Sequence, residues 1–136
     1  MARKTALSRF RSAVGGSNAV EFALVAPLLI GFLFAIYEVG LEIWTQGILD
    51  FAVEQAARCA AINTVACGTT SEIETYAASQ TTPLDLASSV FTAATAACGY
   101  QVTASYSFVF IGEFPINGSN LFPNSVTLTS SSCYPI

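Results

Sequence analysis

The sequence predicts an α+β protein in which a long N-terminal helix, apolar in its first half and amphipathic in its second, packs on a small antiparallel β-sheet. Three observations predict this arrangement. A helical pattern runs without interruption to about Ile62. From Ser88 the composition changes to β-branched, aromatic and small residues, which favour strands. All four cysteines follow the apolar segment. A chain of 136 residues allows one modest domain.

The apolar segment predicts a transmembrane helix over residues 17–38. Its uncharged stretch, residues 22–37, is a little short of the ~20 residues that cross a hydrocarbon core. Residues 19–21 bring it to span length only if Glu21 is neutralised or paired, so we expect Glu21 to have a dedicated partner. The alternative is that Glu21 lies at the headgroup boundary. Pro27 removes one helical hydrogen bond and is expected to kink the helix.

A secretory signal peptide also begins with a basic segment and an apolar core. Here no small-x-small cleavage site follows the apolar run, and the helical pattern continues through Glu38-Val-Gly40-Leu-Glu42. We therefore expect the apolar segment to be kept.

The charges are distributed unevenly along the chain. Four of the five basic residues lie in a leader over residues 1–16, whereas all nine acidic residues lie at or beyond Glu21. A basic N-terminus predicts a cytoplasmic leader and places everything after about Glu38 outside the cytoplasmic membrane. Nucleic acid is excluded as a partner because the rest of the chain has only one base, Arg58.

Beyond the membrane segment the helix is expected to continue as an amphipathic rod, for a total of roughly 65 Å at ~1.5 Å per residue. Its polar side chains recur every fourth residue: Glu42, Gln46, Asp50, Glu54 and Arg58. Its predicted apolar face has a 3–4 spacing: Leu41, Trp44, Ile48, Phe51 and Ala52. Glu38 is assigned to the solvated side together with the other helical carboxylates. Tyr37 and Trp44 are candidate interfacial anchors, although Trp44 fits the core equally well.

Beyond Cys67 the pattern predicts a second, short helix and three strands. Ser71-x-x-Glu74 is a capping box that opens a helix to about Ser79, and Pro83 stops it. Strands are predicted over residues 90–94, 101–111 and 125–131. The alternation from Gln101 to Phe110 predicts one face packed on the helix and one face solvated. Asn117-Gly118 predicts a turn inside the connecting loop, but not a tight two-residue hairpin.

An even number of cysteines in an oxidising compartment predicts two disulfides. If the last two strands pair antiparallel, Cys98 meets Cys133, and Cys59 is left to pair with Cys67. Four cysteines allow three connectivities, and the sequence alone does not settle the choice. Zinc is disfavoured because even the closest pair, Cys59 and Cys67, is farther apart than a C-x2-C pair.

No catalytic constellation is present in the sequence. The chain has no histidine, and neither HExxH nor GxSxG occurs. We therefore predict that the protein is not an enzyme and needs no cofactor or metal.

Three strings resemble one family. They are Ala19-Val-Glu-Phe-Ala-Leu-Val-Ala-Pro-Leu-Leu29, then Glu38-x-Gly40, then Ala52-Val-Glu-Gln-Ala-Ala-Arg58. Together they resemble the TadE-like family, whose members are minor pilins or pseudopilins of the Tad machinery that builds Flp-type IVb pili. The resemblance is strong over residues 12–62 and weak over the remainder.

The resemblance implies cleavage after Gly16 by a prepilin peptidase on the cytoplasmic face, which makes Ser17 the new amino terminus. Glu21 would then be the carboxylate that meets this terminus, in its own or a neighbouring subunit, and Phe22 the aromatic that follows it. The implied partners are the prepilin peptidase, other pilin or pseudopilin subunits, Tad inner-membrane assembly proteins and membrane lipid. Two departures limit the transfer: the major Flp pilin is much smaller, and the larger TadG-like relatives carry an extra domain.

We therefore expect a processed minor pilin that is anchored in a bacterial inner membrane, with its N-terminus cytoplasmic and residues 39–136 periplasmic, and that can enter a pilus. The main alternative is an uncleaved single-pass anchor whose periplasmic domain binds a ligand or protein. A minor pseudopilin of a type II secretion system is a weaker alternative, since that class has a different pattern after the cleavage glycine.

Overall fold

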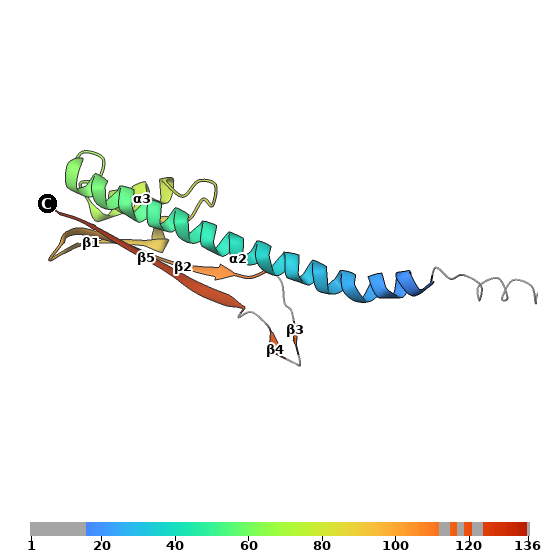
Figure 1. The fold of residues 1–136 in the computed structure, drawn as a ribbon. Coiled ribbons are helices and arrows are strands. Elements are labelled where there is room, and N and C mark those ends of the chain that lie inside the picture. Colours follow the sequence, from blue (N-terminus) through green and yellow to red (C-terminus); the bar gives the residue numbers. More distant parts are fainter. Residues whose placement is uncertain (1–15, 112–114, 117–118, 121–123, 136) are drawn as a thin grey trace, which may run out of the picture. The chain divides into compact units, whose positions relative to one another are not determined.

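The computed structural model describes residues 16–111, 115–116, 119–120 and 124–135 (Figure 1). Its elements are helix α2 (Gly16–Ile62), helix α3 (Thr70–Ser79), the 3-10 turn η2 (Ser88–Val90) and strands β1 (Phe91–Ala96), β2 (Gly99–Val109), β3 (Pro115–Ile116), β4 (Ser119–Asn120) and β5 (Ser125–Tyr134). The chain divides between Tyr37 and Glu38 into two compact units. Helix α2 begins in the first unit and ends in the second.

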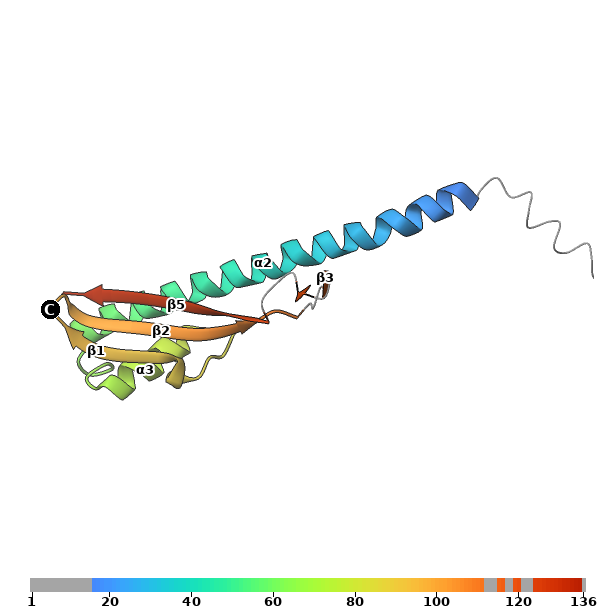
Figure 2. The same cartoon turned by 90° about the horizontal axis from the view of Figure 1, so that it is seen from below.

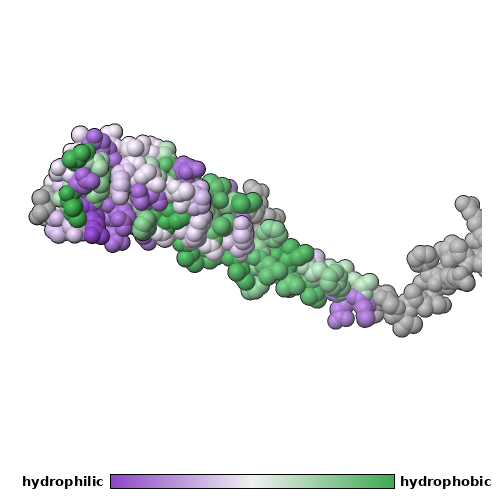
Figure 3. Space-filling view, turned by 90° about the horizontal axis from the view of Figure 1, so that it is seen from above, coloured by the Kyte–Doolittle hydropathy of each residue, from purple (hydrophilic) through white to green (hydrophobic). Residues whose placement is uncertain are grey.

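Helix α2 confirms the predicted long helix. It continues through Pro27 as one element. The part of the helix from Asn18 to Ile62 is long and apolar enough to cross a membrane. Within the part of the chain that the structure describes, none of the most apolar stretch of this helix is buried. Figure 3 shows the hydrophobic atoms gathered along this segment. An apolar surface of this kind needs an apolar environment from outside the chain.

The main sheet has three antiparallel strands in the order β1-β2-β5. Residue Phe91 pairs with Ala104 across β1 and β2, and Ala104 pairs with Ser130 across β2 and β5. All three predicted strands are present, with ends that differ from the prediction by at most three residues. Strand β2 begins at Gly99, which has φ +124° and lies so close to the Tyr134 carbonyl that a Cβ would collide with it. Only glycine fits this crowded start of the strand.

Both helices of the second unit lie on one face of the sheet (Figures 1 and 2). The opposite face presents mainly exposed serine, threonine and alanine side chains, among them Thr92, Ser105 and Thr127. A one-sided antiparallel sheet of this kind explains the alternation predicted for β2. The buried core contains these hydrophobic residues: Leu49, Ala52, Val53, Ala56, Ala57, Ala60, Cys67, Ile73, Ala77, Phe91, Ala93, Val102, Ala104 and Leu128.

The predicted apolar face of α2 is wrong in its orientation. Of its members only Ala52 is fully buried, while Trp44 is 46% and Phe51 51% exposed. The helix turns its alanines toward the sheet instead, at Ala52, Ala56 and Ala60. Small side chains let a helix approach a sheet closely, so the large aromatic side chains are left on the outer side. Trp44 therefore does not belong to the core.

The capping box of α3 lies two residues before the predicted one. Thr69 is the N-cap, its hydroxyl accepts a hydrogen bond from the Glu72 amide at 3.3 Å, and Glu72 accepts one from the Thr69 amide at 3.0 Å. Ser71 and Glu74 were predicted for these roles because they have the same spacing, but Ser71 already lies inside the helix. Helix α3 ends at Ser79, before Pro83, as predicted.

The structure has the disulfides Cys59–Cys67 and Cys98–Cys133, with Cα atoms 5.9 Å and 6.2 Å apart. This confirms the pairing favoured by the antiparallel arrangement, because Cys133 lies opposite Gln101 near the start of β2. In a sheet this small, the two crosslinks add stability that a limited apolar core does not supply alone.

The sequence predicted a turn between β2 and β5 but no two-residue hairpin, and the second part of that prediction was wrong. Strands β3 and β4 pair antiparallel with Ile116 opposite Ser119. That pairing leaves only residues 117 and 118 between the two strands, the spacing of a two-residue hairpin. Asn117 and Gly118 themselves lie outside the described residues.

Candidate functional site

The first candidate site is the beginning of α2, where the chain carries the motif of a glycine followed by a carboxylate. Gly16 is the first residue of the helix, and Ser17 follows it. Glu21 is exposed, and Phe22 is 73% exposed on the adjoining turn. The leader, residues 1–15, lies outside the described residues. The carboxylate and the aromatic ring are thus both presented outward on a regular helix, where a second molecule can reach them.

Glu38 is a buried carboxylate on the face of α2 that meets the sheet. Its side chain is only 3% exposed and accepts hydrogen bonds from the Ile111 amide at 3.0 Å and 3.2 Å. The neighbouring Phe110 amide donates to the Asn124 carbonyl at 3.3 Å. Glu38 therefore fastens the chain just after β2 to the helix, at the residue where the second unit begins.

Glu38 was wrongly assigned to the solvated side of the helix. The stripe Ala60, Ala56, Ala52 and Leu49, followed backward through Thr45 at the same 3–4 spacing, arrives at Glu38. That extrapolation would have identified the buried carboxylate. It was missed because an acidic residue is normally assigned to solvent.

A second contact joins the same helix to strand β5. The Gln46 amide nitrogen donates to the Thr129 carbonyl at 3.1 Å and to the Asp50 carboxylate at 3.0 Å, and the Ser130 hydroxyl donates to Asp50. Strand β5 is an edge of the sheet, and Gln46 binds one of its carbonyls. Glu74 has the corresponding role at the other edge, where it accepts from the Ala93 amide at 3.3 Å. Occupied edges disfavour pairing with foreign strands.

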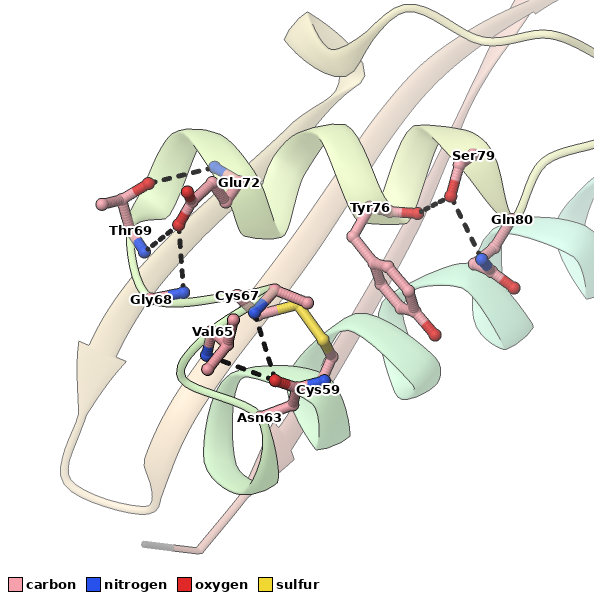
Figure 4. The surroundings of a disulfide bond; sticks show 11 residues. Cys59, Asn63, Val65, Cys67, Gly68, Thr69, Glu72, Tyr76, Ser79 and Gln80 are labelled. Atoms are coloured by element: carbon pink, nitrogen blue, oxygen red, sulfur yellow. Dashed lines mark hydrogen bonds between the residues drawn. A yellow bond between two sulfur atoms is a disulfide. The ribbon is translucent and has the colours of Figure 1, made fainter.

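The Cys59–Cys67 disulfide closes the turn between α2 and α3 (Figure 4). Inside this turn the Asn63 side-chain oxygen accepts from the amides of Val65 at 3.2 Å and Ala66 at 3.1 Å. A hollow of about 330 Å³ lies beside it, open to solvent and lined by Ala66, Ser71, Glu72, Thr75, Tyr76 and Ser79. Because the hollow is open, it lacks the enclosure that a small-molecule site requires.

A comparison with known protein families points to the first of these features, the beginning of α2. A family model described as "TadE-like protein" matches residues 16–58. The chain is TadE-like over this segment. Neither the curated proteins nor the solved structures yield a match.

The TadE-like segment begins at Gly16 and ends at Arg58, so all of it lies within α2. It includes Glu21 and Phe22, which project outward, and Glu38, which is buried. The sheet, α3 and all four cysteines that form the disulfides lie outside the matched segment.

Proposed function

We propose that this protein is a processed minor pilin, or pseudopilin, that acts as a structural or assembly component of a Tad/Flp type IVb pilus. The observation that carries the proposal is the match of the TadE-like family to residues 16–58, which begins at the glycine where processing is expected. The match is supported by the exposed apolar helix that follows this glycine. The proposed role is structural, with no catalytic step.

In this proposal the basic leader stays in the cytoplasm and a prepilin peptidase cuts between Gly16 and Ser17. The helix then spans the inner membrane once and places the second unit in the periplasm, where the two disulfides form. Other pilin or pseudopilin subunits, Tad inner-membrane assembly proteins and membrane lipid are its partners. The subunit then either remains in the membrane or enters the extracellular fibre.

Glu21 and Phe22 are the proposed assembly residues. A carboxylate in an apolar environment is costly unless an opposite charge accompanies it, and cleavage would create such a charge on the Ser17 amine. A pair between Glu21 of one subunit and the Ser17 amine of another would hold two helices in register. The outward position of Glu21 on α2 supports this role, because it has no competing partner fixed in the described part of its own unit.

The proposal is tested by the intact mass and the amino-terminal residue of the protein from native membranes. A chain that starts at Ser17, together with full-length protein when the prepilin peptidase is deleted, is the expected result. A chain that keeps residues 1–16 in the wild-type host would contradict it. In that case an uncleaved anchor with a binding domain would become the better account.

Replacing Glu21 separates assembly from processing. We expect Glu21→Ala to leave cleavage largely intact, because the peptidase acts at Gly16, and to reduce pilus assembly or incorporation strongly, because the charge partner is lost. Quantitative immunoblots of sheared pili and membranes measure both. The matched control is Ala23→Ser, an exposed neighbour that changes no charge. Wild-type piliation in the Glu21→Ala strain would refute the proposed role.

A further inference from the structure

The outer side of α2 in the second unit carries large apolar side chains that the described residues leave exposed. Ile43 is 67%, Trp44 46% and Phe51 51% exposed. They follow one another at the spacing of a single helix face together with two glycines. We call this surface the outer face of α2 and define its apolar part by Gly40, Ile43, Trp44, Gly47 and Phe51. Contiguous exposed apolar surface in an extramembrane unit indicates a contact surface.

The two glycines give the outer face its shape. A Cβ added at Gly40 or Gly47 would meet nothing within 4 Å. Neither glycine is therefore required by packing inside this chain, and each leaves a hollow beside a large side chain. Gly47 lies between Trp44 and Phe51 along the helix, so a side chain of a second helix can enter there. Small residues beside large ones let two helices approach closely.

The outer face ends in two opposite charges. Glu54 and Arg58 continue it at the same spacing, and both are exposed. They have the i,i+4 spacing of an ion pair, yet the structure contains no such pair between these two described residues. Arg58 is the only base among the residues after the leader, in a chain that is otherwise acidic. The outer face is thus the one place where this acidic unit offers a balanced pair of charges to a like molecule.

A parallel, in-register copy of the helix satisfies these charges. Glu54 and Arg58 differ in height by one helical turn, about 6 Å at ~1.5 Å per residue, which the long arginine side chain bridges. In a twofold arrangement each Arg58 then reaches the other copy's Glu54, and the contact closes on itself. An antiparallel pair is excluded if both helices enter the membrane from the same side, which is the topology proposed above.

Lipid does not explain the whole outer face. The rise from Tyr37, at the end of the uncharged stretch, to Phe51 is about 21 Å. The headgroup layer on each side of a bilayer is only about 5–8 Å thick. Phe51, Glu54 and Arg58 therefore lie beyond the reach of a membrane that ends near Tyr37.

We propose that the outer face of α2 binds the same face of a second copy of this chain, in parallel and in register. Ile43, Trp44 and Phe51 form the apolar contact around Gly40 and Gly47, and the reciprocal pairs Glu54–Arg58 fix the register. The proposal rests on the membrane topology given under Proposed function. It does not depend on cleavage after Gly16 or on entry into a pilus.

The test places a photo-reactive benzoylphenylalanine at position 51 in the full chain, expressed in the native host and irradiated in intact membranes. The expected product has twice the mass of the monomer, contains only this chain, and joins residue 51 to a peptide within residues 40–58. The matched control carries the same probe at Val65, which is 91% exposed but lies outside the outer face. We expect no homodimer from it. Absence of a product at position 51, or a product with another protein or with lipid, would overturn the proposal.

Charge reversal tests the register separately from the apolar contact. In the background of the position 51 probe, Arg58→Glu should lower the homodimer yield about fivefold or more, since both reciprocal pairs become repulsive. The double variant Glu54→Arg/Arg58→Glu restores opposite charges and should recover the yield. A yield that is unchanged in Arg58→Glu would contradict the in-register arrangement.

Two readouts on the same membranes separate this proposal from the proposed function. Membrane fractionation reports whether the topology holds, and the intact mass reports whether the chain starts at Ser17. Loss of the homodimer in a chain that is membrane-bound and correctly processed would refute the outer-face contact alone. A homodimer in a chain that keeps its leader would support the contact and contradict the processing.

Discussion

The two halves of α2 differ in where their packing partners come from. Before Glu38 the helix carries large side chains such as Leu24, Leu28 and Phe32, and more than half the surface of each is exposed. After Glu38 its inner side carries alanines that are completely buried under α3 and the sheet. The first half therefore requires an environment supplied from outside, and the second supplies its own. One continuous helix can serve both purposes because helix formation depends on the backbone, whereas stability depends on what each face contacts.

Glu38 marks the change from one half to the other. From Asn18 onward it is the first buried side chain of the helix, and it accepts a hydrogen bond from the Ile111 amide that follows β2. Substitutions that act on only one half should therefore leave the other unaffected. This separation can be tested in the full-length protein in detergent.

The largest effect is expected from removing the Cys98–Cys133 disulfide. This crosslink closes a sequence separation of 35 residues, compared with 8 for Cys59–Cys67, so chain entropy predicts losses of about 4 and about 2.5 kcal/mol. Urea unfolding of Cys98→Ala/Cys133→Ala, followed by far-UV circular dichroism, measures the loss. The helical signal of the apolar half should persist after the sheet has unfolded. The control is Cys59→Ala/Cys67→Ala, and a larger loss there would contradict the ranking.

The next prediction makes the same substitution in each half. Ala56 is completely buried against the core, so Ala56→Leu should lower the free energy of unfolding by about 1–3 kcal/mol through overpacking. Ala23 is exposed in the apolar half, and Ala23→Leu should change that free energy by less than about 0.5 kcal/mol. Urea midpoints of the two variants, measured in parallel, give the comparison. Equal losses would show that the two halves are not independent.

Removal of the Glu38 carboxylate tests the residue at the boundary. We expect Glu38→Ala to lower the free energy of unfolding by about 1–3 kcal/mol, because a buried polar contact is lost and the Ile111 amide loses its acceptor. Amide hydrogen exchange should quicken at Ile111. Glu42→Ala is the matched control, since Glu42 lies one turn further on and is only half-buried. Similar losses in the two variants would remove the special role of Glu38.

Long-range features of this fold could be predicted where local pattern and tertiary packing agree. The helix to Ile62, the three strands and both disulfides follow from periodicity, β propensity and antiparallel pairing. The helix face was misassigned because the large residues Trp44 and Phe51 are more apolar than alanine, although the buried side of α2 consists mainly of alanines together with Leu49 and Val53. Hydrophobicity alone therefore selected the wrong side of the helix.

In the candidate site, the residues that are close in sequence were predicted, whereas the contact between distant residues was not. Gly16, Ser17, Glu21 and Phe22 lie close together in the chain, so their motif is visible in the sequence, and their proposed roles await the processing and assembly experiments. The hydrogen bond from the Ile111 amide to Glu38 joins residues that are 73 positions apart. A contact of that kind depends on the return of β2 to the helix, which no local pattern specifies.

The smallest expected effect distinguishes two neighbouring residues with the same capping chemistry. Thr69 donates its amide to Glu72 and accepts from the Glu72 amide, so Thr69→Ala should lower the free energy of unfolding by about 1 kcal/mol. Ser71 was the predicted cap, but it lies inside α3 and exposed to solvent, so Ser71→Ala should change that free energy by less than about 0.5 kcal/mol. The urea midpoints of both variants measure the difference. A larger loss for Ser71→Ala would move the start of α3 to the predicted position. Because α3 lies on the second unit alone, neither substitution should alter the membrane insertion of the apolar half, and cell fractionation verifies that independence.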